Sequence, residues 1–308
     1  MEMHAPLALG ADDLGEELMA VFPMHTYSQI DLTAWTKVGE GYNGQAFISD
    51  ANPGKLLKLV HGTLSSAEKV EQEFYASQAA FEAGLPTPRV YEIVRNGQEH
   101  GYISERIEDK ISFSRLCADA PERIPEYAAL MARYGHELHA HPLSVSRYVP
   151  SLKSLLREAV AFAPFVTQAQ RERLSSLVDE MADTDTAVHG DFQPGNLILS
   201  HDKPYWIDLG WLCVGDPVID LAHLYKMMMQ DCVIPAVQDL THMTREQMIS
   251  FWQEFARAYT GQADLTALEQ KMRPYAALDI VRTYFFHPND DPRFLAFCRG
   301  RMDENLGN

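Results

Sequence analysis

The sequence predicts an α+β protein with two lobes, a small β-rich lobe followed by a larger helical one. Up to about residue 108, short runs of β-favouring residues alternate with turn signals, and beyond it apolar residues recur at helical spacing. A chain of 308 residues with 46% hydrophobic content can bury one or two cores. We therefore expect an N-terminal lobe over residues 1–106, a C-terminal lobe over residues 107–308, and a ligand cleft between them.

The first elements are two strands joined by a tight turn. The stretch TKVGEGYNGQAFISDANPGKLLKLVHG predicts strand, turn and strand, with the turn at residues 52–54, where Pro fixes φ and Gly accepts positive φ. Before it, Gly39, Gly41 and Gly44 have the spacing GxGxxG. Since another strand follows them and not a helix, they favour a flap over phosphates instead of a dinucleotide turn. The alternative is that the glycines only permit a tight turn.

Next, the sequence predicts a helix over residues 65–83, with Ser65 and Glu68 in a capping box at its start. The runs RVYEIV and HGYISERI then predict two more strands, joined by the turn Asn96-Gly97.

Lys58 lies on the second strand of the first hairpin. Alternation places Lys58 on the same face as Leu56 and Val60, where an unpaired ammonium would be costly. Glu71 and Glu73 on the following helix are candidate partners, and we prefer Glu73 because it borders the apolar stripe that should face the sheet. The alternative is that Lys58 extends its ammonium to solvent.

Helical periodicity dominates the second half. In PERIPEYAALMARYGHELHAHP, the apolar residues Ile124, Ala128, Met131 and Leu138 share one face. Further helices are predicted at about residues 167–182, 217–230, 244–260 and 264–286.

Three polar side chains gather in the stretch HGDFQPGNLILSHDKPYWIDLG. Asp191 and Asn196 flank a Pro-Gly pair and are predicted to lie on a loop, followed by a hairpin of LILS and YWID. A four-residue turn HDKP would pair Leu197 with Asp208 and bring Asn196 close to Asp208. Together they would hold one hard cation, and Mg²⁺ suits such a site because it uses few protein oxygens. With Asp191 facing the same space, this layout is typical of phosphoryl transfer.

At these motifs the chain resembles a known family, the aminoglycoside phosphotransferase and choline kinase group of protein-kinase-like small-molecule kinases. HGDFQPGNLIL with WIDLGWLCVGDPVIDLA is similar to that group's HxDxxxxN signature, metal-binding aspartate and downstream GDPxxDLA element. ELHAHP is similar as well, and the resemblance spans about residues 39–223. It implies a bilobal protein-kinase-like fold.

The resemblance also implies roles for individual residues. Asp191 is expected to be the catalytic base or the group that orients the acceptor hydroxyl, and Asn196 and Asp208 to hold Mg²⁺. Lys58 is expected to contact the α- and β-phosphates of ATP, with Glu73 steadying it.

Further residues follow from the same likeness. The segment SERI, which includes Glu105 and Ile107, resembles the hinge whose backbone binds adenine, and the Gly-rich flap would cover the phosphates. His189 is expected to support the catalytic loop. Asp216, before a proline, is expected to cap a helix, and Asp220 either braces the catalytic loop or extends an acidic first turn.

The predicted activity is transfer of the γ-phosphate of ATP, or GTP, to a hydroxyl of a small acceptor. Only LGWLCVG separates Asp208 from Asp216 and no APE element is present, which favours a small molecule over a protein substrate. The alternatives are a protein Ser/Thr kinase and a non-catalytic nucleotide-binding scaffold. The acceptor, the choice between ATP and GTP and the oligomeric state stay open.

The charge composition limits the classes of binding partner that we expect for this protein. With 26 basic and 43 acidic residues, the net charge of −17 argues against binding along nucleic acids or anionic membranes, and is compatible with a cationic, amine-bearing acceptor. Trp211 is a candidate aromatic wall for such a cation or a core residue. Candidate amine partners lie near the C-terminus: Asp290, Asp291, Asp303 and Glu304.

The remaining features of the sequence concern the cellular compartment of the protein. The four cysteines are far apart and predict buried free thiols: Cys117, Cys213, Cys232 and Cys298. No export signal or membrane span is apparent, so the sequence predicts a cytoplasmic protein.

Overall fold

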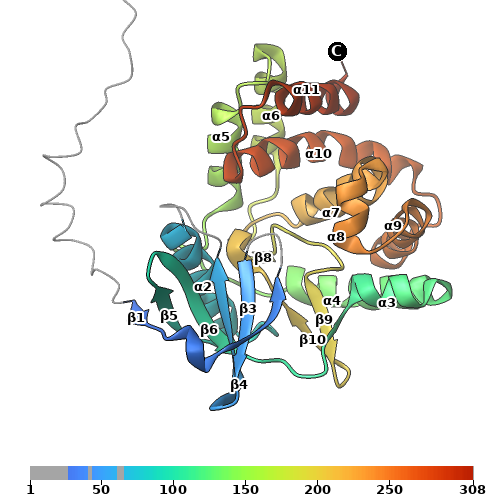
Figure 1. Ribbon diagram of the computed structural model, residues 1–308. Coiled ribbons are helices and arrows are strands. Elements are labelled where there is room, and N and C mark those ends of the chain that lie inside the picture. The colour runs from blue at the N-terminus through green and yellow to red at the C-terminus, as the bar shows by residue number, and fades with distance from the viewer. Residues whose placement is uncertain (1–26, 41–43, 61–65, 308) are drawn as a thin grey trace, which may run out of the picture.

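A computed structural model of the chain describes residues 27–40, 44–60 and 66–307. A twisted sheet forms the N-terminal part, and helices with two small sheets form the C-terminal part (Figure 1). The predicted α+β class with a β-rich first lobe and a helical second lobe is confirmed. The predicted boundary after residue 106 falls in the linker between β6 and β7 and stays a prediction.

The six-stranded sheet has the order β1-β5-β6-β4-β3-β2, antiparallel except for the parallel pair β1 and β5. Its strands are β1 (Ser28–Gln29), β2 (Thr36–Glu40), β3 (Gly44–Ser49), β4 (Asn52–Val60), β5 (Val90–Asn96) and β6 (Glu99–Glu105). Helix α2 (Ser66–Ala83) crosses between β4 and β5 and lies against the sheet (Figure 1).

Strand alternation divides the apolar side chains of the sheet between its two faces. Val60, Ile93 and Tyr102 pack with Val70 and Phe74 of α2. The opposite face forms a separate small cluster around Leu57 and Leu59. Lys58 therefore points toward α2, as the alternation predicts.

The C-terminal part contains the larger core, in which α4 packs on α9 and α7 on α10. Its helices are α3 (Phe113–Asp119), α4 (Ile124–His139), α5 (Leu152–Phe162), α6 (Gln168–Glu180), α7 (Val218–Tyr225), α8 (Pro235–Thr241), α9 (Arg245–Thr260), α10 (Thr266–Phe286) and α11 (Pro292–Leu306). Its strands are β7 (Ile111–Ser112), β8 (Ala187–Val188), β9 (Leu197–Ser200), β10 (Lys203–Trp206) and β11 (Cys213–Val214).

The helices predicted from periodicity are confirmed, and the four apolar residues of the α4 face are all buried. Four helices were not predicted: α3, α5, α8 and α11. Two of these begin with a proline, Pro235 and Pro292. Proline at the first helical position is a start signal, and Asp291 caps α11 by accepting the Arg293 N–H.

The turn predicted at residues 52–54 is wrong. Residues 50 and 51 form the turn, and residues 52–54 begin β4 at a register shift opposite Ser49. Pro53 lacks an N–H group, so a bulge tolerates it. The second predicted turn is present but lies one residue later, because Asn96 pairs with Glu99 and the turn consists of Gly97, at φ +61°, and Gln98.

The predicted register of the hairpin formed by β9 and β10 is also wrong. Leu197 pairs with Trp206, not with Asp208, because the turn contains two residues and not four. His201 and Asp202 have φ of +48° and +63°, the left-handed values of the two-residue turns that match strand twist. Ile207 N–H instead donates to the Asn196 carbonyl at 3.0 Å.

Ser65, in the predicted capping box, and Gly41 lie outside the described residues. All four cysteines are free and buried, as predicted. Within the described ranges, no helix is long and apolar enough to cross a bilayer.

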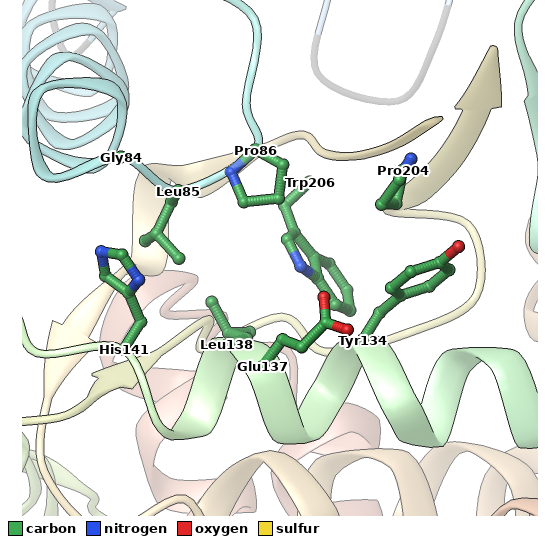
Figure 2. A pocket seen from close by; sticks show the side chains of 9 residues that line it. All are labelled: Gly84, Leu85, Pro86, Tyr134, Glu137, Leu138, His141, Pro204 and Trp206. Carbon is green, nitrogen blue, oxygen red and sulfur yellow. The ribbon is translucent and has the colours of Figure 1, made fainter. Parts of the chain in front are cut away.

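A cavity of about 200 Å³ lies between the end of α2, helix α4 and strand β10 (Figure 2). Across it, Pro86 and Trp206 face Tyr134, Glu137 and Leu138 of α4. None of the residues predicted to bind phosphate lines it, so it is separate from the site described next.

Candidate phosphotransfer site

The loop between β8 and β9 carries Asp191 and Asn196, and its shape depends on Gly190. This glycine has φ +82°, and a Cβ atom there would lie 2.2 Å from the Trp211 carbonyl oxygen. Only glycine combines this backbone conformation with this close approach. The motif HGD therefore has a structural reason beside any chemical one.

Asp220 of α7 holds this loop through hydrogen bonds to its backbone. Its carboxylate accepts the backbone N–H groups of His189 at 2.7 Å and Gly190 at 2.8 Å, and it lies 3.1 Å from His139 Nε2. Burial would raise the pKa of Asp220, but His139, His189 and the backbone donors lower it below its ordinary value. Of the two open interpretations of Asp220, the structure supports the brace.

His189 connects the loop to the residue before Asp208. Its Nδ1 accepts the Asp191 N–H at 3.2 Å, and its Nε2 lies 3.1 Å from the Ile207 carbonyl. One nitrogen accepts and the other donates, so the ring is neutral with its proton on Nε2. Burial accordingly lowers the pKa of His189. The predicted support of the loop by His189 agrees with these contacts.

The Asp191 carboxylate is held by amides. Asn196 Nδ2 donates to Asp191 Oδ2 at 2.7 Å and to the Asp191 carbonyl at 2.9 Å, and Gln193 Nε2 lies 3.3 Å from Oδ1. The Asp191 side chain remains 30% exposed, so another molecule has access to it. Gln193 is two residues from Asp191, and the sequence analysis missed it.

Asp208 follows β10 in the left-handed conformation, with φ +58°. Its Oδ1 lies 2.7 Å from Lys58 Nζ, which also lies 2.7 Å from Glu73 Oε1. Burial would lower the pKa of Lys58, yet Asp208 and Glu73 raise it well above its usual value. The charge of Lys58 in turn lowers the pKa of Asp208. Both groups are therefore ionised at neutral pH.

The preferred partner of Lys58 is the one observed. Glu73 Oε1 also accepts from the Tyr102 hydroxyl at 2.8 Å, whereas Glu71 accepts from the Tyr27 hydroxyl at 2.5 Å. The two glutamates, two residues apart on α2, thus face different partners.

The geometry brings Lys58, Asp208 and Asp191 to one region. His189 links the backbone of Asp191 to the carbonyl of Ile207, the residue before Asp208. Asn196 is joined to Asp208 through the backbone pair of Asn196 and Ile207. The predicted gathering of these side chains is therefore observed, although the predicted register that led to it is wrong.

The donors fit a magnesium ion in its usual manner. Mg²⁺ binds through one or two protein oxygens and completes its shell with phosphate and water. Asp208 is 46% exposed, and the Asn196 amide turns its nitrogen to Asp191, which leaves its oxygen for another ligand. Within the described residues no group of three or more acidic, His or Cys side chains could hold a metal by itself.

The structure describes two of the three predicted flap glycines, Gly39 and Gly44, and these two differ in the space available for a Cβ atom. A Cβ on Gly44 would lie 2.1 Å from the Leu59 carbonyl oxygen, so strand packing alone requires this glycine. A Cβ on Gly39 would meet only the Ala46 Cβ, at 3.8 Å. In the predicted hinge, the Glu105 N–H donates to the Arg89 carbonyl at 2.7 Å, while Ile107 follows in the linker.

Trp211 is half-buried and stacks on Phe286, with ring centroids 4.6 Å apart. The guanidinium of Arg282 lies 5.0 Å from the Trp211 ring centroid. A cation of the protein itself therefore already occupies the neighbourhood of this ring. Asp216 accepts the Val218 N–H at 3.0 Å, a capping contact, although the helix boundary places Pro217 at the cap.

The four acidic side chains near the C-terminus form hydrogen bonds or ion pairs with other residues of the protein. Asp290 accepts from the Tyr284 hydroxyl at 3.0 Å, and Asp291 caps α11 and pairs with Arg293. Asp303 accepts from Gln170 at 2.9 Å, and Glu304 pairs with Arg301 at 2.8 Å. These contacts do not bring the four acids together as one amine site.

Three buried charged residues behind Asp191 escaped the sequence analysis. His223 of α7 lies 3.0 Å from Asp191, and Asp279 and Arg282 of α10 lie behind it. A helical signal was available, because His223 lies three residues after Asp220, and such pairs share a face. No local signal identifies Asp279, which meets His223 only through packing of α7 on α10.

Known proteins resemble this chain in sequence profile and in fold. The profile of the phosphotransferase enzyme family matches residues 34–275. A search of curated protein sequences found no match. Among solved structures, a thermostable mutant of the aminoglycoside phosphotransferase APH(4)-Ia, in a complex with ADP and hygromycin B, is similar with a TM-score of 0.59 and 17% identity over 88% of this chain and 92% of that one.

Two other solved structures have the same fold. A choline/ethanolamine kinase family protein from Mesorhizobium loti gives a TM-score of 0.54 at 17% identity, over 96% of this chain and 93% of that one. The GDP and kanamycin complex of APH(2'')-IIIa gives 0.54 at 18% identity, over 91% and 95%. At these identities the likeness establishes a shared kinase-like fold.

Proposed function

Because the chain belongs to the phosphotransferase enzyme family, we propose that it transfers the γ-phosphate of a nucleoside triphosphate to a hydroxyl of a small-molecule acceptor. One observation carries the proposal. The Lys58 ammonium and the Asp208 carboxylate meet at 2.7 Å, and His189 links the loop that carries Asp191 to the residue before Asp208. A cation for phosphate, a carboxylate for metal and a carboxylate for the hydroxyl are the parts that phosphoryl transfer requires.

The proposed roles follow from these positions. Lys58, steadied by Glu73, binds the phosphates, and Asn196 and Asp208 hold Mg²⁺. When bound, Mg²⁺ neutralises the charge on the phosphate oxygens. Asp191 accepts a hydrogen bond from the acceptor hydroxyl and aligns its oxygen for attack.

The nucleotide is proposed to lie under the flap of Gly39, Gly41 and Gly44, with its base at Glu105 and Ile107. ATP and GTP are both candidates, since the related structures include one complex with ADP and one with GDP. We propose a cytoplasmic location, because nucleoside triphosphates are available there.

The acceptor is proposed to be a small molecule rather than a protein. The segment after Asp208 forms η3 (Leu209–Trp211), then strand β11 on β8, and reaches α7 at Val218. This compact path leaves no long activation loop on which a protein substrate would dock. Hygromycin B, kanamycin and the choline or ethanolamine of similar proteins suggest an amine-bearing alcohol.

A transfer assay tests this proposal. The protein is incubated with γ-labelled ATP or GTP, with and without Mg²⁺, and with panels of aminoglycosides, amino alcohols and sugars. Label transfer to at least one alcohol, dependent on Mg²⁺, is the expected result. Nucleotide binding without transfer to any alcohol would favour a non-catalytic scaffold, and transfer to a protein Ser or Thr alone would favour a protein kinase.

A further inference from the structure

A cluster of buried charges lies directly behind the Asp191 carboxylate. It consists of His223 on α7, Asp279 and Arg282 on α10, and Lys226 on the π-helical turn after α7 (Lys226–Gln230). Asp279 and Arg282 are fully buried, and His223 is 7% exposed. Buried charges are costly unless they are paired, so the cluster requires an explanation.

His223 connects two carboxylates. Its Nδ1 lies 3.0 Å from Asp279 Oδ2, and its Nε2 lies 3.0 Å from Asp191 Oδ1. The second contact has the distance of an ion pair without the alignment of a hydrogen bond. A carboxylate at each nitrogen favours a proton on both, which makes the ring an imidazolium. Burial alone would lower the pKa of His223, but Asp279 and Asp191 raise it to about 9.

Asp279 is in turn fixed by two other cations. Arg282 Nη2 lies 2.5 Å from Asp279 Oδ1, and Lys226 Nζ lies 3.3 Å from Asp279 Oδ2. The same Arg282 nitrogen donates to the Gly190 carbonyl at 2.5 Å, in the residue before Asp191. The cluster thus holds both the backbone and the side chain of the loop that carries Asp191.

We propose that His223 is a positioning residue for phosphate transfer, which fixes the orientation of the Asp191 carboxylate through Oδ1 and maintains its charge. This inference rests on the proposed function. Asn196 and Gln193 hold Asp191 from the amide side, and His223 supplies the only charged contact that the structure gives its carboxylate within the described residues. With both oxygens restrained, one free lone pair can face the acceptor hydroxyl.

The arrangement also defines how Asp191 works. His223 and Asn196 outweigh the effect of burial and lower the pKa of Asp191 below its ordinary value. A carboxylate stabilised in this way is a weak base. The contacts of His223 and Asn196 fix the direction in which Asp191 can accept a hydrogen bond from the acceptor hydroxyl.

Two substitutions separate the contacts of His223. In His223→Asn, the side-chain amide replaces Nδ1 and keeps the contact to Asp279 but not that to Asp191. In His223→Gln, the amide reaches the Nε2 position and keeps a donor near Asp191. His201→Asn is the matched control, because His201 lies in the exposed β9–β10 turn, where Asn tolerates the left-handed conformation.

We expect His223→Asn to lower kcat by about 10- to 100-fold, the usual effect of losing a supporting contact, with the nucleotide KM within about twofold of wild type. His223→Gln should retain several-fold more activity than His223→Asn. In the wild type, kcat should fall as the pH rises through about 9, and His223→Gln should lack this step. An unchanged kcat in His223→Asn, or equal losses in both variants, would overturn the role.

An NMR titration of the imidazole needs neither turnover nor a folded His223 variant. His223 should titrate near pH 9 in the wild type and at lower pH in Asp191→Asn. A His223 ring that is neutral at pH 7, or that Asp191→Asn does not affect, would overturn the inference. If this coupling is present but the wild type phosphorylates no acceptor, the proposed function fails while the ion pair stands, so the two failures are distinguishable.

Discussion

Lys58 Nζ lies 2.7 Å from Asp208 Oδ1, although 150 residues separate them in the chain. The contact joins β4 of the sheet to the turn after β10, and Glu73 of α2 completes it at 2.7 Å. Helix α2 packs on η3 at the same place. The contacts that dock the two lobes therefore also place the ammonium of Lys58 for phosphate binding.

Asp191→Asn should lower kcat by roughly 10²- to 10⁴-fold, the range for loss of a positioned acid–base group. Nucleotide affinity should stay nearly unchanged, because Asp191 faces the acceptor hydroxyl in the proposed reaction. Steady-state kinetics together with calorimetric nucleotide binding measure both effects. A parallel loss of nucleotide affinity would contradict this role.

Asp208→Ala should weaken binding of the magnesium nucleotide about tenfold or more, since it removes a charged metal ligand. Binding measured over a series of Mg²⁺ concentrations should show the midpoint shifting to higher metal. Metal dependence equal to that of the wild type would remove Asp208 from the magnesium site.

Glu73→Gln should raise the nucleotide KM by roughly tenfold, the equivalent of 1.4 kcal/mol, because Lys58 loses one of the two anions that orient it and keeps only Asp208. Glu71→Gln is the matched control on the same helix, since Glu71 contacts Tyr27 and not Lys58. The KM of the control should remain within about twofold of wild type. Similar KM values for the two variants would show that the Lys58 pair does not position phosphate.

Asp220→Asn should destabilise the protein by about 3 kcal/mol, because an amide cannot accept from both His189 and Gly190 without placing its own donor against one of them. Urea unfolding followed by circular dichroism gives the change in the free energy of unfolding. Asp216 likewise accepts two backbone N–H groups, from Val218 and Ala182, but the Ala182 contact is exposed to water, so Asp216→Asn serves as the exposed control, with a change below about 1 kcal/mol. Equal stability of Asp220→Asn and wild type would contradict the brace.

Stability should fall in mildly alkaline solution. The folded-state pKa of His223 is about 9, above its ordinary value, so its contribution is complete below about pH 6.5 and is lost as the pH rises through 9. Urea midpoints between pH 6 and about 9.5 should decline for the wild type. His223→Asn should decline less over the same interval. Parallel curves for the two proteins would exclude His223 as the titrating group.

Much of the site follows from local sequence. The period of two in β4 places Lys58 on the face of Val60, and the helical period of α2 favours Glu73 as its partner. The Pro-Gly pair predicts the loop between Asp191 and Asn196. These predictions succeed because each depends on residues near one another in the chain. The hairpin turn failed at the same scale, because the left-handed conformations of His201 and Asp202 shortened it.

The sequence by itself determined the order of the elements, the two-lobed class and the residues that carry the proposed chemistry. Only the tertiary structure decided that Asp220 holds the catalytic loop, that Asp279 and Arg282 stand behind His223, and that Trp211 neighbours an internal cation. The physical reason is that these contacts arise where α7, α10 and the loop pack together. The packing angle between two helices, and the charge pairs formed between residues far apart in the sequence, give no periodic pattern in the sequence of either segment.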